Sequence, residues 1–278
     1  MPAPETRPLG AVTDWSGGSV VKSRYNLIAA DYVDTRHPDR PTEVKDIHHL
    51  EPGERPDRGP LREEMHRDST VFLMGEGIAE RGGSYKVTVD LLKEFGPERV
   101  MDTPIAEASF TGAGVGAAIA GMRPVVEILF IDFAMLVLDQ IINQAAKYRF
   151  MSGGEAKVPF VLRSQGGVGN GLAAQHSESL EAIFYHIPGL NVVMPSTPYD
   201  AKGLLKSAIR SDDPVIFLEH KLLYMTKGDV PESEYTIEFG KADIKRKGTD
   251  ATIIAWSNMA PRSLAAAEKL AEQGIDAE

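Results

Sequence analysis

Short apolar runs alternate with longer helix-like segments between residues 61 and about 227. The runs end at glycine, proline or polar residues, as buried strands do: TVFLMGEG, RVMDTPIAE, RPVVEILF, VPFVLRS, LNVVMPS and DPVIFLE. Three intervening segments are predicted to be helices: YKVTVDLLKEFG, FAMLVLDQIINQAAKYRFMSGG and PYDAKGLLKSAIR. Buried strands that alternate with helices of this length predict an α/β fold, a mostly parallel sheet with helices on both faces.

The predicted sheet also predicts where a functional site would lie. In open parallel sheets, ligands bind outside the carboxyl ends of the strands. The loops that follow Met74, Thr103, Phe130, Arg163 and Met194 should therefore share one edge of the sheet.

The sequence on either side of this region has a different character. Residues 1–60 contain RHPDRPTEV and EPGERPDRGP and little apolar periodicity, which predicts an irregular N-terminal arm before a domain at 61–233. From 234 onward, GKADIKRKGTDATIIAW predicts a hairpin or crossover into a buried strand, APRSLAAAEKLAEQG a helix, and IDAE the start of another strand. These elements cannot enclose a core. Residues 234–278 are therefore expected to be an incomplete second domain, or to pack on the first domain or a partner.

Composition excludes several classes of function. The net charge of −10 argues against nucleic acid as a partner. No run of apolar residues is long enough to span a membrane, and residues 1–30 lack the pattern of a secretory signal. The absence of cysteine excludes disulfides, thiolate nucleophiles and cysteine-ligated metals. We expect an intracellular protein.

One segment, DTPIAEASFTGAGVGAAIAG at 102–121, places a carboxylate before a helix with few large side chains. The small residues Gly112, Gly116 and Ala120 recur every four positions and would line one stripe of that helix. Such a stripe permits another backbone to approach closely, either inside one domain or between subunits. The run GAGVG lacks the G-x-G-x-x-G spacing of a dinucleotide site.

The pattern E-x4-G-Φ-x-x-G-Φ, formed by Glu107, Gly112, Ala113, Gly116 and Ala117, resembles the signature of the pyrimidine-binding domain of thiamine diphosphate enzymes. Further blocks resemble the beta subunit of the 2-oxo acid dehydrogenase decarboxylating component, in family order: MGEGIAERGGSYKVT, FGPERVMDTPIAE, DQIINQAAKYRFMSGG, AAQHSE and GKADIKRKGTDATIIAW. The resemblance covers 61–278. Residues 1–60 are atypical of the family, whose C-terminal domain would be only about half present here.

The resemblance implies roles for four side chains. Glu107 would hydrogen-bond the far ring nitrogen of the aminopyrimidine and drive it into the imino form, a role that suits an acid in a water-poor pocket. Phe133 would pack against that ring, and Glu76 would be a further acid near the cofactor. His176 would face the active-site channel and assist acyl transfer to a lipoyl group, since imidazole donates or accepts a proton near neutral pH.

The resemblance also implies partners and ions. The family holds Mg²⁺ through a G-D-G motif in a separate domain, and no GDG occurs in this sequence. An alpha subunit would therefore hold Mg²⁺ and the diphosphate, in a heterotetramer of two alpha and two beta chains that acylates a lipoyl-bearing acyltransferase core. A monovalent cation such as K⁺ would be held by residues at Phe160, Ala208, Ser211 and Asp213.

Several alternatives remain open at this point. The chain could be a non-catalytic beta-like subunit that only binds an alpha-type partner, or one subunit of a split transketolase. Phe133 and AAQHS resemble pyruvate- or acetoin-type sequences more than branched-chain ones. The expected location is the bacterial cytoplasm, or the mitochondrial matrix for a eukaryotic source.

Overall fold

The computed structural model describes residues 11–13, 19–21, 58–169 and 171–278 of the 278-residue chain. Most of the predicted N-terminal arm thus lies outside the described residues. The first two strands, β1 (Ala11–Thr13) and β2 (Ser19–Val21), pair antiparallel. The elements that follow are α2 (Arg58–Arg67), β3 (Val71–Gly75), α3 (Leu91–Phe95), β4 (Val100–Asp102), α4 (Glu107–Ile119), β5 (Arg123–Ile128), η2 (Ile131–Val137), η3 (Asp139–Ala145), α5 (Ala146–Met151), β6 (Val161–Gly166), η4 (Ala174–His176), α6 (Glu181–Tyr185), β7 (Asn191–Val193), α7 (Pro198–Arg210), β8 (Val215–His220), η5 (Lys221–Leu223) and α8 (Met259–Ala271).

Six strands, β3 to β8, form one sheet in the order β4-β3-β5-β6-β8-β7, and every neighbouring pair is parallel. All six expected strands are present. The four inner strands, β3, β5, β6 and β8, are buried over almost their whole length because helices cover both faces, whereas the edge strands β4 and β7 are partly exposed. The predicted α/β fold is confirmed, and the sheet is wholly parallel.

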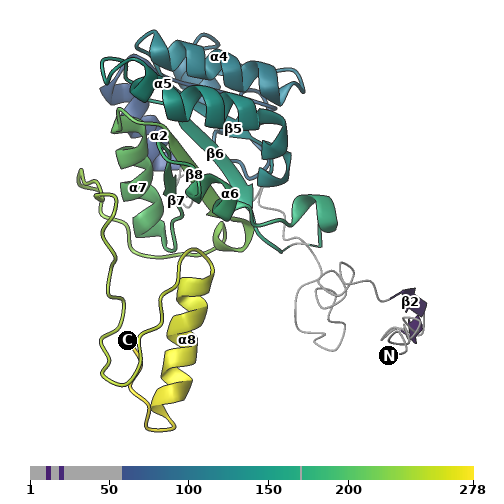
Figure 1. The fold of residues 1–278 in the computed structure, drawn as a ribbon, viewed down its shortest axis with the longest axis vertical. Helices are drawn as coiled ribbons and strands as arrows, with labels where there is room; N and C mark the ends of the chain where they lie inside the picture. Colours follow the sequence, from purple (N-terminus) through teal and green to yellow (C-terminus); the bar gives the residue numbers. More distant parts are fainter. Residues whose placement is uncertain (1–10, 14–18, 22–57, 170) are drawn as a thin grey trace, which may run out of the picture.

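Helices cover both faces of the sheet (Figure 1). On one face, α2, α3 and α7 enclose a core cluster that includes Leu61, Leu73, Leu91, Leu205 and Phe217. On the other face, α4, η2, η3 and α6 enclose a second cluster that includes Phe110, Ile131, Ile141, Phe160 and Phe184. The carboxyl ends of the strands are left for loops, as expected for a sheet of this class.

The helix predicted for residues 85–96 is wrong over its first half. Only Leu91–Phe95 is helical, and Asp90 before it has a left-handed backbone with φ of 65°. The preceding residues Val87 and Thr88 are buried in the loop, where Thr88 Oγ1 donates to the Ile78 carbonyl at 2.6 Å. β-Branched residues lose little when they leave a helix, and tertiary contacts decide the outcome here.

The single long helix predicted from Phe133 to Gly154 forms three pieces. η2 is a 3₁₀ helix, η3 has π geometry, and α5 is α-helical. α4 lies close to this path, since a Cβ on Gly112 would be 3.4 Å from Gln140 Cγ. Within η3, Asn143 Nδ2 donates to Asp139 Oδ1 at 2.7 Å on the solvent side, while Ile141 and Ala145 are buried.

The segment after the sheet domain runs along α7. Ile237 N donates to the Gly203 carbonyl at 3.2 Å, Ser207 Oγ donates to the Ile237 carbonyl at 2.6 Å, and the ring of Tyr235 stacks on that of Tyr199. Gly203 permits this approach, because a Cβ there would lie 2.6 Å from Ile237 Cγ1. This linker, which contains Tyr235 and Ile237, therefore packs on α7 through both backbone and side-chain contacts.

This close approach predicts opposite effects for two glycine-to-alanine changes. Gly203→Ala should lower the free energy of unfolding by about 1–3 kcal/mol, because the new methyl group displaces Ile237 or Tyr235. Gly116→Ala on α4 should raise it by up to about 1 kcal/mol, since nothing lies within 4 Å of its Cβ and alanine favours the helix. Urea unfolding of the two variants measures both effects. Equal midpoints would show that the linker does not depend on Gly203.

The C-terminal unit differs from prediction. The expected helix is present as α8, but ATIIAW at 251–256 is not a buried strand: Ile254 is 86% and Trp256 54% exposed. Ala251 forms only an isolated parallel bridge with Ala277, supported by a hydrogen bond from Ile253 N to the Glu278 carbonyl at 2.7 Å. Among the described residues nothing forms a second layer over this segment, so its apolar side chains are exposed.

Candidate functional site

An acid pair lies at the carboxyl edge of the sheet. Glu107 is the first residue of α4 and is 7% exposed, in the position where the helix dipole favours a carboxylate. Glu76 follows β3, and its Oε1 is buried without a hydrogen-bond partner among the residues described. Burial raises the pKa of Glu76, and the charge of Glu107 raises it further. Two acids thus share a poorly solvated space.

The loop that carries Glu76 is fixed by β4. Asp102 Oδ1 accepts from Ala79 N at 2.7 Å, and its Oδ2 accepts from Glu80 N at 3.2 Å. Thr103 N donates to the Gly75 carbonyl at 3.0 Å, directly before Glu76. The sequence therefore places the two acids on neighbouring loops of adjacent strands.

The structure brings Phe133 and His176 together. Phe133 lies in η2, which packs against α4, and its ring meets the His176 ring edge-on with centroids 5.5 Å apart. Phe130 also contacts His176, at 4.5 Å between ring centroids. Asp132 Oδ1 accepts from the backbone N–H groups of Ser177 and Glu178 at 3.0 and 3.1 Å. The predicted aromatic residue and the predicted histidine thus share one surface.

The four positions predicted to hold a monovalent cation lie at the opposite, amino-terminal edge. The Phe160 carbonyl accepts from Val215 N at 2.8 Å, and the Ser211 carbonyl accepts from Arg123 Nη1 at 2.9 Å. Asp213 forms an ion pair with Arg149, and Ala208 is buried in α7. The guanidinium of Arg123 thus already supplies positive charge at the Ser211 carbonyl. The binding of a monovalent cation by these four residues stays a prediction. Among the described residues, no group of three or more His, Asp or Glu is arranged to hold a metal.

A buried ion cluster was not predicted from the sequence. Arg163 on β6 is 1% exposed and pairs with both Glu127 on β5 and Glu219 on β8. Tyr224 OH donates to Glu219, and the Tyr224 ring stacks on Tyr85. The available signal was one charged residue inside each of three apolar strand runs, because unpaired charges are not tolerated in such runs.

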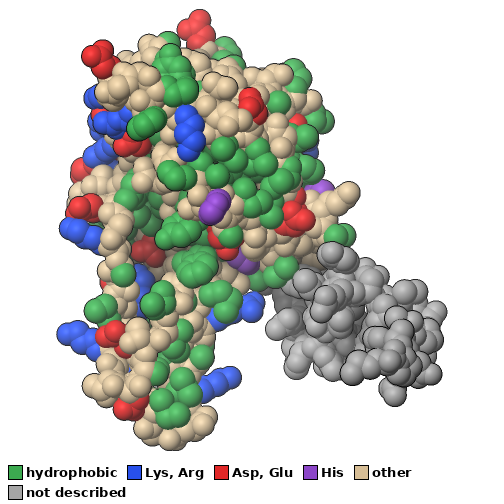
Figure 2. Space-filling model, in the orientation of Figure 1, with side chains coloured by type: hydrophobic (Ala, Val, Ile, Leu, Met, Phe, Trp, Pro, Cys, Tyr) green, Lys and Arg blue, Asp and Glu red, His purple; other side chains and the backbone are tan. Residues whose placement is uncertain are grey.

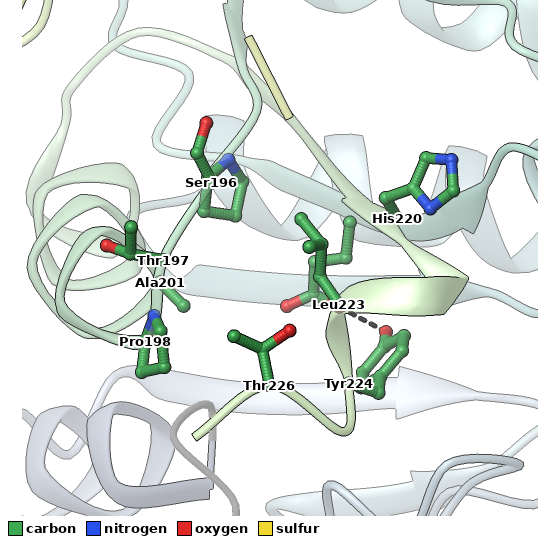
Figure 3. Close-up of a pocket in the computed structure, with 10 residues that line it drawn as sticks. Ser196, Thr197, Pro198, Ala201, His220, Leu223, Tyr224 and Thr226 are labelled. Carbon is green, nitrogen blue, oxygen red and sulfur yellow. Dashed lines mark hydrogen bonds between the residues drawn. The ribbon is translucent and has the colours of Figure 1, made fainter. Parts of the chain in front are cut away.

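A small pocket opens at the carboxyl ends of β7 and β8 (Figure 3), and its lining includes none of the four predicted site residues. Thr197 and Pro198 face Leu223 and Thr226 across it. His220 also lines the pocket, and burial, followed by the charges of Arg262 and Lys221, lowers its pKa to about 4. His220 is therefore neutral near pH 7.

Two family models match the chain. The pyrimidine-binding domain of transketolase matches residues 59–227, and the transketolase C-terminal domain matches residues 240–278. The chain is 51% identical over 218 residues to the 2-oxoisovalerate dehydrogenase subunit beta of Bacillus subtilis, with 78% of this chain and 67% of the relative covered. It is 51% identical over 221 residues to the pyruvate dehydrogenase E1 component subunit beta of Porphyra purpurea, with 80% and 67% covered. This chain belongs to the beta subunits of thiamine diphosphate-dependent 2-oxo acid dehydrogenases.

Another relative of this beta subunit has a different named substrate. The acetoin:2,6-dichlorophenolindophenol oxidoreductase subunit beta of Cupriavidus necator is 50% identical over 228 residues, with 78% of this chain and 67% of the relative covered. A solved split-gene transketolase, an inactive beta4 tetramer, is 20% identical with a TM-score of 0.65 over 80% of this chain and 68% of that one. That likeness supports the fold alone.

The buried groups at the acid pair fit the pyrimidine end of thiamine diphosphate. Glu107 provides a buried carboxyl group, and the half-buried Glu76 contributes an Oε1 atom that is buried without a hydrogen-bond partner among the described residues. Orphaned polar atoms in a native site call for a ligand or an ordered water. The half-buried Phe133 adds an aromatic surface at the same edge.

Among the described residues of the beta subunit, none of the helices has the length and apolar character that a membrane span requires.

Proposed function

We propose that this beta subunit supplies the pyrimidine-binding half of a thiamine diphosphate site for oxidative decarboxylation of a 2-oxo acid and acyl transfer to a lipoyl domain. The observation that carries the proposal is the buried Glu107 at the start of α4, beside a second acid whose pKa is raised. Bound there, thiamine diphosphate would supply the nucleophilic carbon.

Glu107 would hydrogen-bond the far nitrogen of the aminopyrimidine and share a proton with it. A carboxyl group with little access to water is suited to share a proton with a weakly basic ring nitrogen. Glu76 adds a second acid to the same space, where burial and the charge of Glu107 raise its pKa. Phe133 would pack against the ring, and His176 would donate or accept a proton in the transfer of the acyl group to the lipoyl thiol.

The diphosphate and Mg²⁺ come from an alpha subunit in this proposal, because the sequence contains no GDG motif. Hydrophobic side chains gather on the face that includes α4, α5 and α6 (Figure 2). Exposed apolar residues in or next to these elements include Ile105 before α4, Leu136 in η2, Phe150 and Met151 in α5, and Tyr185 in α6. Contiguous exposed apolar surface marks a protein–protein interface. It supports assembly with an alpha chain and a second beta chain.

Four exposed small residues, Ser109, Ala113 and Gly116 on α4 and Ala120 directly after it, lie on one face of the helix. This stripe differs from the expected one, because Gly112 is turned toward Gln140 inside the domain. A face without bulky side chains permits a neighbouring helix to approach closely, which supports the placement of the shared site at a subunit interface.

The substrate is a 2-oxo acid or acetoin, and K⁺ at residues 160, 208, 211 and 213 is retained as part of the proposal. The relatives named above act on 2-oxoisovalerate, pyruvate and acetoin at nearly equal identity. We place the protein in the cytoplasm for a bacterial source and in the mitochondrial matrix for a eukaryotic one; the Arabidopsis thaliana relative is named mitochondrial.

Calorimetry on the separate and mixed subunits tests this division of the site. The beta subunit alone should bind thiamine diphosphate and Mg²⁺ too weakly to measure, and its mixture with the alpha subunit of the same organism should bind at micromolar concentration. Micromolar, Mg²⁺-dependent binding by the single chain would overturn the shared site. Failure of the mixture to bind would refute the catalytic proposal.

A further inference from the structure

The two ends of the loop after β6, at Gly167 and Glu178, lie close together and form what we call its neck. Gly167 N donates to the Glu178 carbonyl at 2.8 Å, so the two ends of the loop meet. His176 lies at this neck, in η4. Ala173, shortly before it, has a left-handed backbone with φ of 62°, and its carbonyl accepts from Ser177 Oγ at 2.6 Å. A non-glycine residue keeps this conformation only where its surroundings enforce it. The placement of His176 therefore depends on what holds the neck together.

A buried lysine holds both sides of this neck. Lys221, the first residue after β8, is 2% exposed. Its Nζ donates to the Gly167 carbonyl at 3.2 Å and to the carbonyl of His176 itself. One ammonium group thus bridges the first residue of the loop and the histidine near its end. Since charge-assisted hydrogen bonds are stronger than neutral ones, this bridge fixes the backbone of His176.

The same ammonium also supports the imidazole ring. Lys221 Nζ lies 4.7 Å from the centroid of the Phe130 ring, within the range of a cation–π contact. The Phe130 ring in turn lies 4.5 Å from the His176 ring. The ammonium therefore acts on the histidine through two routes, its own carbonyl and the aromatic ring against which its side chain packs.

Burial of the Lys221 ammonium group carries a desolvation penalty. Burial lowers the pKa of Lys221, and the nearby Asp132 opposes that shift. Asp132 also accepts from the N–H groups of Ser177 and Glu178, the two residues that follow His176. A methionine would fill the volume of Lys221 without the desolvation penalty of a buried charge. The Lys221 ammonium group is therefore needed for its hydrogen bonds to the loop and not for filling space.

We propose that Lys221 is a positioning residue that holds the His176 imidazole in the geometry needed for acyl transfer to the lipoyl group. This inference rests on the role proposed above for His176. Lys221 does not touch the reacting atoms; it fixes the backbone and the aromatic neighbour of the residue that does. Misplacement by about 1 Å of a group that takes part in catalysis can reduce a rate by about 10²-fold, so loss of this bridge has a measurable consequence.

The test uses the assembled alpha–beta enzyme with Lys221→Met. Acylation of a lipoyl domain should fall by about tenfold or more, while decarboxylation measured with an artificial electron acceptor stays within about twofold of wild type. Lys221→Arg keeps the positive charge and the donors, and should restore most of the acylation rate. The matched control is Lys206→Met, because Lys206 is equally buried but pairs with Glu63 and Glu234 on the opposite face of the sheet. It should alter stability without altering the ratio of the two rates.

A double-mutant cycle separates positioning from general damage. In a His176→Ala background, Lys221→Met should cause little further loss of acylation, because no imidazole remains for Lys221 to position. A full additional loss, or an equal fall in both assays for Lys221→Met alone, would refute the positioning role.

Amide hydrogen exchange distinguishes failure of this inference from failure of the role assigned to His176. Lys221→Met should accelerate exchange at the amides of Ser177 and Glu178, whatever chemistry the histidine performs. Unchanged exchange overturns the positioning role. The other outcome is accelerated exchange in Lys221→Met together with equal losses in both assays for His176→Ala. That outcome would support Lys221 as the residue that holds the loop and would reject acyl transfer as the role of His176.

Discussion

Glu107→Gln in the assembled enzyme should lower turnover by about 10²-fold or more, while the affinity for thiamine diphosphate stays within about tenfold of wild type. Glutamine keeps the size of the side chain and can still hydrogen-bond a ring nitrogen, so the buried start of α4 is preserved. It cannot share a proton with that nitrogen. Steady-state rates with an artificial electron acceptor and calorimetric titration of the cofactor measure the two quantities.

The proton-transfer step can also be observed directly. Hydrogen–deuterium exchange at the thiazolium carbon, followed by NMR, should slow in the Glu107→Gln enzyme. Glu64→Gln provides the control, since Glu64 is fully buried but pairs with Arg67 and Arg210 on the opposite face of the sheet. It should lower stability and leave the exchange rate unchanged. Wild-type exchange in the Glu107 variant would show that this acid has only a structural role.

The sheet could be predicted because each strand is a buried run rich in valine, isoleucine and leucine between turn residues. α7 was predicted at its observed bounds for local reasons. Thr197 caps it by accepting from Asp200 N at 3.1 Å, and Pro198 occupies its first turn. The segment before α3 has equally regular spacing, but Val87 and Thr88 gain more from the loop core than from a helix. Local pattern cannot show such a tertiary preference.

The site was predicted in part, and mainly through the family resemblance. Spacing alone does not show that Phe133 and His176 meet, because that contact depends on β5 and β6 being neighbours in the sheet. Lys221 carries no local signal, since a lysine after a strand is usually solvated. Its role emerges only when β8 pairs with β6 and brings it to the neck of the His176 loop.

Arg163→Met should cause the largest loss of stability of any change considered for this chain. Arg163 lies between Glu127 and Glu219, on three adjacent strands, and all three side chains are buried. Removal of one member of a buried ion pair costs about 3–5 kcal/mol, because the remaining charge is left without compensation. Here two carboxylates would lose the same guanidinium. Urea unfolding near pH 8 should show this loss, or the variant should fail to fold.

The pH dependence of the loss identifies its cause. Burial raises the pKa of Glu127 above its ordinary value of 4.5, while Arg163 opposes that rise. Without Arg163 the pKa rises further, so native Glu127 keeps a proton that the unfolded chain releases. That contribution to stability is complete below pH 4.5 and is lost as the pH rises through the native pKa. The variant should therefore recover part of its stability near pH 5, whereas a loss caused by packing alone would not depend on pH.

Neutralising the whole cluster separates the electrostatic penalty from the lost volume. Adding Glu127→Gln and Glu219→Gln to Arg163→Met removes both uncompensated charges and should restore most of the stability at pH 8. The amide oxygen of the glutamine that replaces Glu219 can still accept from Tyr224 OH, which preserves the contact that joins the cluster to Tyr85. If the triple variant is as unstable as Arg163→Met alone, the guanidinium stabilises the sheet by filling space, and charge compensation is not its role.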